Sequence, residues 1–328
     1  MLQKTSFFTE SFAMSRFLAA LIALWPLAAS AQGALDREIS PALAEARDAW
    51  LNGRYEGIWD TVRAAAEAGD PVAQNILGAS LTEKDGGKGL AYDPAAGLDW
   101  YRRAAEQGFA RAHFNMALFW QNDHDGFGID YDKTRALAEE AIALDYPQGW
   151  NLLGDMYFHG RGVEADKVMA LEMYRKGADA GTFNGLREVG YAYYHGNGVA
   201  RDVDLSRVYL ERAVAAGDTK SIPDLAWLYE GNDGIAQDLL KSYLLYRMGV
   251  EKGVAKAAFE LGLFVAWEDY EGFWHDPVKG YGYCLLGLDW GHSLEEGDAA
   301  ADCEEIAEGF DETRRATARA FAESLKAR

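Results

Sequence analysis

The sequence is poor in cysteine and proline, and it has no long apolar run beyond its N-terminus. Two Cys and seven Pro occur among 328 residues. Two cysteines allow one intrachain disulfide at most. After the first 31 residues, no stretch reaches the roughly 18 apolar residues that a membrane-spanning helix needs. The sequence therefore predicts no membrane span.

Basic residues are also scarce, because 32 Lys and Arg accompany 52 Asp and Glu, for a formal net charge of −20. Such acidity argues against nucleic acid and anionic lipid as ligands. Solubility of an elongated surface is the simplest explanation, and attraction of a basic partner surface is the alternative.

Signals of catalysis and metal binding are missing too. No Gly-rich phosphate loop, nucleophile elbow or zinc-type ligand spacing is present. His159 and His195 share one turn position in adjacent units, which favours a role in the turn over a metal site. Residues 122–126 resemble part of a calcium loop but lack its final Glu, so an acidic surface insert is the better interpretation. We predict no catalytic residue, no cofactor and no metal.

The N-terminus has the pattern of a secretory signal peptide. A short basic start at Met14-Ser15-Arg16 precedes an apolar run from Phe17 to Ala28, and Ala29-Ser30-Ala31 matches a cleavage site. We expect residues 1–31 to be this signal peptide, with Met14 as an alternative true start. Export to the periplasm, or secretion beyond it, would follow.

One pattern recurs six times between residues 73 and 291. Each copy has a small residue, then four positions later Leu-Gly or a close variant, and an aromatic or large apolar residue three positions after the Gly. These residues form one stripe on a helix. The repeated Gly or its Ala substitute falls at Gly78, Ala117, Gly154, Gly190, Ala226 and Gly262. The spacing of 36 to 39 residues is typical of stacked helical hairpins. We interpret the Gly as a point where a side chain would clash with the adjacent helix.

A Gly-rich turn links the two helices of a unit. In two units it reads Gly-x-Gly-Val, at 160–163 and 196–199, and Asp166 and Asp202 follow three residues later. Gly supplies positive φ at such a turn, and Asp suits the N-cap of the second helix. Units one, two and six carry inserts in the turn, at 82–90, 121–127 and 267–273.

The pattern resembles the Sel1-like repeat, a relative of the tetratricopeptide repeat, most closely in 153–163 and 100–108. The resemblance implies an all-α, right-handed α-solenoid of stacked helix-turn-helix repeats and an adaptor role. We predict an N-terminal capping helix pair at 34–69 (helices from Leu35 to Asn52 and Arg54 to Ala68), six repeats at 70–291, and C-terminal capping helices at 292–328.

Both cysteines fall near the C-terminal end, Cys284 in the last repeat and Cys303 in the first closing helix. Antiparallel neighbouring helices would bring them within bonding range, and an exported protein meets oxidising conditions. We predict a disulfide. The alternative is that both are buried small apolar residues.

A second stripe on the first helices is the candidate partner-binding surface, which the resemblance places on a concave face. It occupies the positions three before, one after and four after each repeated Gly. The middle units combine rigid aromatics with polar groups there, as peptide-binding sites do. The candidate residues are Asn151, Asp155, Arg187, Tyr191, Tyr194, Trp227 and Glu230. Packing between repeats is the alternative role of such aromatics.

The resulting hypothesis is an exported, non-catalytic, monomeric scaffold that binds a protein or peptide partner, in envelope signalling or complex assembly. One alternative is a cell-wall-directed enzyme or binder with β-lactamase-like activity. Family members linked to that activity have a Cys pair in each repeat, and this chain lacks that pattern, which argues against the alternative. Another is a secreted factor that acts on host proteins.

Overall fold

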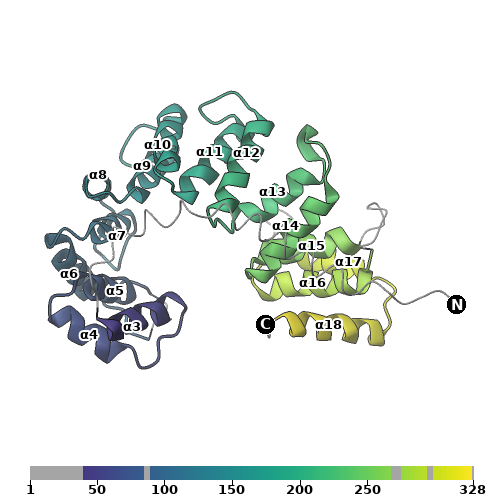
Figure 1. Cartoon of the computed structure of the whole chain (residues 1–328), viewed down its shortest axis with the longest axis horizontal. Coiled ribbons are helices and arrows are strands. Elements are labelled where there is room, and N and C mark those ends of the chain that lie inside the picture. The colour runs from purple at the N-terminus through teal and green to yellow at the C-terminus, as the bar shows by residue number, and fades with distance from the viewer. Residues whose placement is uncertain (1–39, 85–88, 267–274, 294–297, 327–328) are drawn as a thin grey trace. The chain divides into compact units, whose positions relative to one another are not determined.

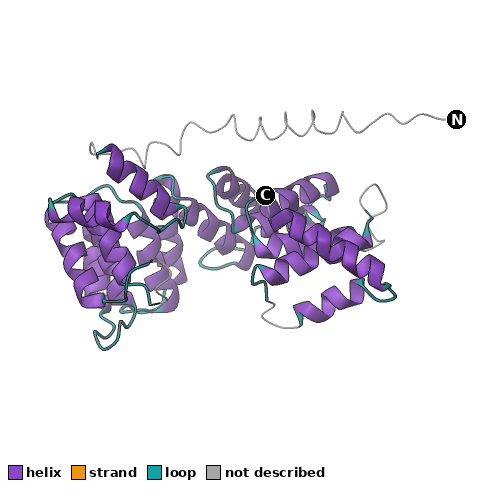
Figure 2. Cartoon of the chain, turned by 90° about the horizontal axis from the view of Figure 1, so that it is seen from below, coloured by secondary structure: helices purple, strands orange, loops and turns teal. Residues whose placement is uncertain are grey.

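The computed structural model describes residues 40–84, 89–266, 275–293 and 298–326. Over these ranges it contains 16 α-helices and one short 3-10 helix, and no strand occurs in them (Figure 2). No helix among the described residues is long and apolar enough to cross a membrane. The predicted signal peptide, the first residues of the predicted N-terminal cap and the insert at 267–273 lie outside the described residues.

The helices follow one another as antiparallel hairpins (Figure 1), and the two helices pack together in the hairpins α5–α6, α7–α8, α9–α10, α13–α14 and α15–α16. The chain divides into unit 1, residues 1–192 with 196–200, and unit 2, residues 193–195 with 201–328. In chain order the elements are α3 (Pro41–Leu51), α4 (Trp59–Glu67), α5 (Pro71–Leu81), α6 (Pro94–Glu106), α7 (Ala110–Gln121), α8 (Tyr131–Ala143), α9 (Gln148–His159), α10 (Lys167–Asp179), α11 (Phe183–His195), α12 (Val203–Ala215), α13 (Ser221–Tyr229), η2 (Asn232–Gly234), α14 (Leu239–Glu251), α15 (Ala255–Ala266), α16 (Pro277–Asp289), α17 (Ala299–Ile306) and α18 (Glu312–Lys326). The predicted fold class, an all-α solenoid of helix-turn-helix repeats, is confirmed.

An Asp caps the second helix of every hairpin from α5–α6 to α15–α16. Its carboxylate accepts a hydrogen bond from a backbone N–H in the first turn of the helix, and its own N–H donates to the carbonyl three residues after the repeated Gly, at 2.8 to 2.9 Å. The six residues are Asp93, Asp130, Asp166, Asp202, Asp238 and Asp276. This capping stabilises each helix start and closes the turn in the same way whatever its length.

The glycines of the two regular turns behave as predicted. Gly160 and Gly196 end α9 and α11 in the left-handed region, with φ of 67° and 70°. Gly198 also has positive φ, 72°, and a Cβ there would lie 2.2 Å from the carbonyl oxygen of Lys167. The turn therefore needs Gly both for its backbone conformation and for its close approach to α10.

The Gly of the apolar stripe leaves room for the second helix, as predicted. A Cβ at Gly78 would lie 2.5 Å from the ring of Tyr101, and one at Gly154 would lie 2.4 Å from the ring of Tyr174. At Gly262 the obstacle is the backbone of Cys284, at 2.7 Å. Close packing of helix against aromatic ring or backbone thus explains why the residue recurs.

The two ends of the chain differ in how well they match the predicted capping helices. α17 and α18 fall inside the segment 292–328 where C-terminal capping helices were predicted, and Cys284 and Cys303 form the predicted disulfide, with a Cα–Cα distance of 5.6 Å. Both cysteines are fully buried in the core between α16 and α17. The predicted start of the second N-terminal helix at Arg54 is wrong, because α4 begins at Trp59. Gly57 has a φ of 77°, which interrupts a right-handed helix.

Candidate functional site

The predicted partner-binding residues divide between the two units. Asn151, Asp155, Arg187 and Tyr191 belong to unit 1, and Tyr194, Trp227 and Glu230 belong to unit 2. Exposure follows the position within the repeat. The position one residue after the repeated Gly is exposed or half-buried in all six hairpins: Ala79, Leu118, Asp155, Tyr191, Trp227 and Leu263. This position therefore carries the accessible part of the stripe.

The position three residues before the Gly is mostly internal, which removes Asn151 from the candidate surface. Asn151 is 7% exposed, and its Nδ2 donates to Oγ1 of Thr182 at 3.1 Å. In the first hairpin the equivalent Asn75 is also buried, and its Oδ1 accepts from Nδ2 of Asn115 at 2.8 Å. Both side chains join neighbouring helices, so the visible role of Asn151 is in packing.

The remaining candidates of unit 1 are half-buried, and two of them have polar partners within the fold. Tyr174 Oη donates to Asp155 Oδ1 at 2.7 Å, and Arg187 Nε lies 3.2 Å from Glu188 Oε1. Burial raises the pKa of Asp155, while the hydrogen bond from Tyr174 and nearby cations, Arg187 among them, lower it. Tyr191 is half-buried on the same helix as Arg187. Asp155 and Arg187 are thus each engaged by a side chain of unit 1.

In unit 2, Trp227 is the large aromatic side chain that the stripe exposes most, at 38%. The ring of Tyr194 packs edge-on against it with centroids 6.4 Å apart, and Tyr194 Oη donates to Asp233. Arg201 donates to the Tyr194 carbonyl at 2.9 Å and to Asp233 Oδ1 at 2.7 Å. We call these four residues the Trp227 cluster. Its aromatic rings are fixed before any ligand arrives.

Glu230 lies one turn beyond Trp227 and is partly used within the fold. Its Oε1 accepts a hydrogen bond from Tyr246 Oη at 2.7 Å. Tyr246 is fully buried, so this contact satisfies a phenol that water does not reach. Glu230 thus joins α13 to α14, and its half-buried carboxylate also contributes negative charge at this side of α13.

Two carboxylates, one on α13 and one on α15, were not among the predicted site residues. Asp224 Oδ1 on α13 lies 2.7 Å from Lys256 Nζ on α15. Burial raises the pKa of Glu260 on α15 to about 6; Lys256 lowers it, and Glu230, Asp224 and Asp302 raise it further. A signal was available in the sequence, because the position two residues before the repeated Gly is acidic in three consecutive hairpins: Glu188, Asp224 and Glu260.

The raised pKa of Glu260 predicts a gain in stability when its charge is removed. Because the folded-state pKa of about 6 exceeds the ordinary Glu pKa of 4.5, the folded state is favoured below pH 4.5 and loses this advantage as the pH rises through 6. Glu260→Gln should raise the free energy of unfolding by about 1–2 kcal/mol at pH 7.5 and by about half that or less at pH 5. Urea denaturation at the two pH values measures this, with Glu56→Gln in an exposed loop as control. An equal gain at both pH values would contradict the assignment.

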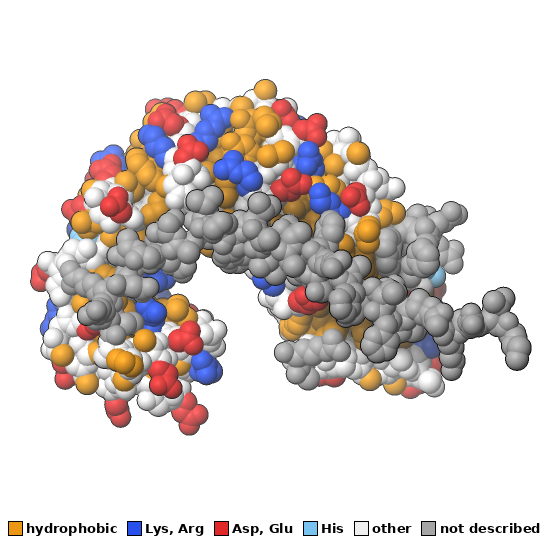
Figure 3. Space-filling view, viewed as in Figure 1, with side chains coloured by type: hydrophobic (Ala, Val, Ile, Leu, Met, Phe, Trp, Pro, Cys, Tyr) orange, Lys and Arg blue, Asp and Glu red, His pale blue; other side chains and the backbone are white. Residues whose placement is uncertain are grey.

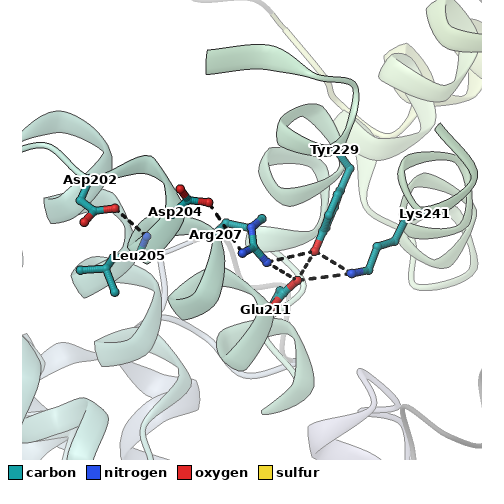
Figure 4. Close-up of polar contacts among 7 residues, drawn as sticks. All are labelled: Asp202, Asp204, Leu205, Arg207, Glu211, Tyr229 and Lys241. Atoms are coloured by element: carbon teal, nitrogen blue, oxygen red, sulfur yellow. Dashed lines mark hydrogen bonds and ion pairs between the residues drawn. The ribbon is translucent and has the colours of Figure 1, made fainter. Parts of the chain in front are cut away.

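A further polar cluster, which the sequence did not reveal, joins α12, α13 and α14 (Figure 4). Glu211 Oε1 accepts from Tyr229 Oη, from Arg207 Nη1 at 3.1 Å and from Lys241 Nζ at 3.4 Å. Lys241 Nζ also donates to Tyr229 Oη at 2.7 Å. Arg207 and Lys241 thus each contact both the Glu211 carboxylate and the Tyr229 phenol. The cluster therefore fixes three helices together, and its groups are already engaged with one another.

Metal ligands do not gather anywhere in the described part of the chain, where no group of three His, Cys, Asp or Glu has suitable geometry. In the segment that resembles a calcium loop, Asp123 Oδ1 accepts from the N–H groups of Gly126 and Gly128, and Asp125 pairs with Lys84 at 2.8 Å. These carboxylates stabilise their own loop.

On the face drawn in Figure 3, charged side chains of both signs alternate with apolar ones.

The stacked hairpins and their repeated Gly–aromatic contacts define a helical repeat protein. The Sel1 repeat family model matches residues 71–109, 151–182, 184–218 and 224–254. The chain therefore contains Sel1 repeats in these four segments.

Similar proteins agree with this fold. A Sel1 repeat protein from Oxalobacter formigenes superposes with a TM-score of 0.57 at 22% identity, covering 79% of this chain and 100% of that one. A protective antigen present in uropathogenic Escherichia coli strains superposes with a TM-score of 0.56 at 23% identity, covering 96% of this chain and 71% of that one. An uncharacterized protein of Neisseria meningitidis serogroup B is 28% identical over 99 residues, or 29% of this chain; the chain spans 20% of the length of this relative.

Proposed function

We propose that this chain is an exported, non-catalytic scaffold that binds a protein or peptide partner, and that the Trp227 cluster is a centre of binding. The observation that carries the proposal is an exposed Trp on a repeat helix, held edge-on by a Tyr whose hydroxyl and carbonyl are both engaged. Trp, Tyr and Arg dominate the binding energy of protein interfaces. Rings already ordered in the free protein lose little entropy when a partner binds.

Two further features support the organisation and location in this proposal. Helix pairs α7–α8 and α15–α16, outside the matched repeats, share the Asp cap and its hydrogen bond with the others, so we include them as diverged repeats. Six repeats would then occupy residues 70–291, between capping helices at 34–69 and 292–328. The Cys284–Cys303 disulfide favours an oxidising compartment, which agrees with the predicted signal peptide at 1–31 and with a periplasmic location.

The proposal predicts that Trp227→Ala weakens partner binding about tenfold or more, since it removes a large anchor at the centre of the surface. The partner is first identified by chemical crosslinking in the native envelope, and its affinity for purified wild type and variant is then measured by calorimetry. Leu240→Ala on α14 is the matched control, because Leu240 is 55% exposed and apolar but lies outside the cluster. Equal affinity for wild type and Trp227→Ala would contradict the assigned centre. Failure to capture any partner would contradict the scaffold function.

A further inference from the structure

The accessible side of α13 carries a carboxylate on each side of its exposed indole. Asp224 precedes Trp227 by three residues and Glu230 follows it by three, so both neighbour it along the helix. The Asp224 side chain is 28% exposed and Glu230 is half-buried. An aromatic face between two acidic groups is therefore presented on one helix.

The neighbouring helices add more negative than positive charge. Lys256 on α15 is paired with Asp224, and Glu260 lies one turn further along α15. The charges that act on Glu260 are those of Lys256, Glu230, Asp224 and, from α17, Asp302. Of these charged groups, one is a cation and four are carboxylates, while Arg201 of the Trp227 cluster is paired with Asp233. We call Asp224, Trp227, Glu230 and Glu260, with Lys256, the α13–α15 surface.

The ionised carboxylate of Glu260 on this surface lowers the stability of the fold. The pKa of Glu260, raised to about 6, shows that its ionised form is disfavoured by burial and by its acidic neighbours. A group that destabilises the fold is typical of a functional surface, where activity and stability conflict. A cation brought by a ligand would remove the conflict by neutralising the excess charge.

We propose that the α13–α15 surface binds a cationic segment of a protein partner, with one Arg or Lys side chain over the Trp227 ring and another beside Asp224 and Glu260. This inference rests on the proposed scaffold function and names the chemistry of its partner. Indole is the best aromatic acceptor of a cation, and flanking carboxylates add complementary charge. A single exposed indole offers too little apolar area for a purely hydrophobic helix, and an acidic segment would be repelled.

The test uses the full chain and a defined probe, a fluorescein-labelled dodecapeptide of alternating Arg and Gly, with a Glu-Gly peptide as its counterpart. At about 0.15 M salt, where charges beyond roughly 8 Å are screened, we expect binding of the Arg-Gly peptide alone. Trp227→Ala should weaken this binding about fivefold or more, through loss of the cation–π contact. Lys256→Gln should strengthen it about threefold, because a competing cation is removed from the surface.

The matched control for Lys256→Gln is Arg63→Gln. It makes the same change in net charge at an exposed residue of α4, in the other unit. Equal strengthening by both substitutions would show attraction by net charge only and would overturn the inference. Unchanged affinity in Trp227→Ala would overturn it as well. If the peptide does not bind but a natural partner is captured through Trp227, the cationic class is wrong and the scaffold function stands.

Discussion

Removing the Cys284–Cys303 disulfide is expected to lower the free energy of unfolding by about 3 kcal/mol. The bond closes a loop between residues 19 apart in sequence, and a loop of that length restricts the unfolded chain by about this amount. Both cysteines lie in the core that also contains Phe259, Tyr281 and Ile306, so the region loses a crosslink where its helices meet. Guanidinium denaturation of the double variant Cys284→Ala, Cys303→Ala, compared with wild type, measures the loss.

The double variant also controls for the reductant. Wild type treated with dithiothreitol in denaturant should shift to the midpoint of the double variant, while the double variant itself should not respond. No shift on reduction, with both thiols then open to alkylation, would contradict a stabilising bond. It would leave the cysteines as packed apolar residues.

Substituting Gly154 with Ala is expected to destabilise unit 1 by about 2–3 kcal/mol, because a single methyl group overpacks the contact between α9 and α10. The new Cβ would lie 2.4 Å from the ring of Tyr174. That ring cannot swing aside without losing the hydrogen bond from its hydroxyl to Asp155 at 2.7 Å. Urea denaturation of Gly154→Ala and wild type measures the change.

The second hairpin provides the control for this clash. There Ala117 replaces the Gly and Ala138 stands where the aromatic ring is found, both fully buried in one core cluster. Combining Gly154→Ala with Tyr174→Ala reproduces this arrangement. The double variant should therefore be more stable than the sum of the single effects by about 1 kcal/mol or more. Strict additivity would show that the ring is not the obstacle.

The fold could be predicted largely from the repeated residues, because each carries its own physical reason. The stripe glycines mark close contacts, and the turn glycines mark positive φ. The Asp caps were recognised at Asp166 and Asp202 alone. In hairpins with inserts the Asp lies 13 to 15 residues after the repeated Gly or Ala instead of 12, so a fixed spacing does not find it. The closing hydrogen bond of the cap is nevertheless the same in all six hairpins.

The surroundings of the candidate site residues were harder to predict. Helical spacing tells which face of the helix a side chain is on, but not whether a neighbouring helix covers that face. Asn151 and Trp227 belong to one stripe, yet Asn151 contacts Thr182, the N-cap of α11, and Trp227 is exposed to solvent. The shift between the two positions is four residues, about one turn, and neighbouring helices cover only one of them. The charge around Glu260 was missed for a similar reason, since its neighbours come from α13 and α17.

The most direct test of the scaffold function places a benzophenone amino acid at position 227 and, separately, at position 240, and irradiates cells that carry each full-length variant. The account predicts a defined protein adduct from position 227 and none, or a far weaker one, from position 240, although Leu240 is the more exposed of the two. The adduct should map to a cationic segment of the partner. Adducts of equal yield from both positions, or a stronger adduct from position 240, would contradict binding at the Trp227 cluster.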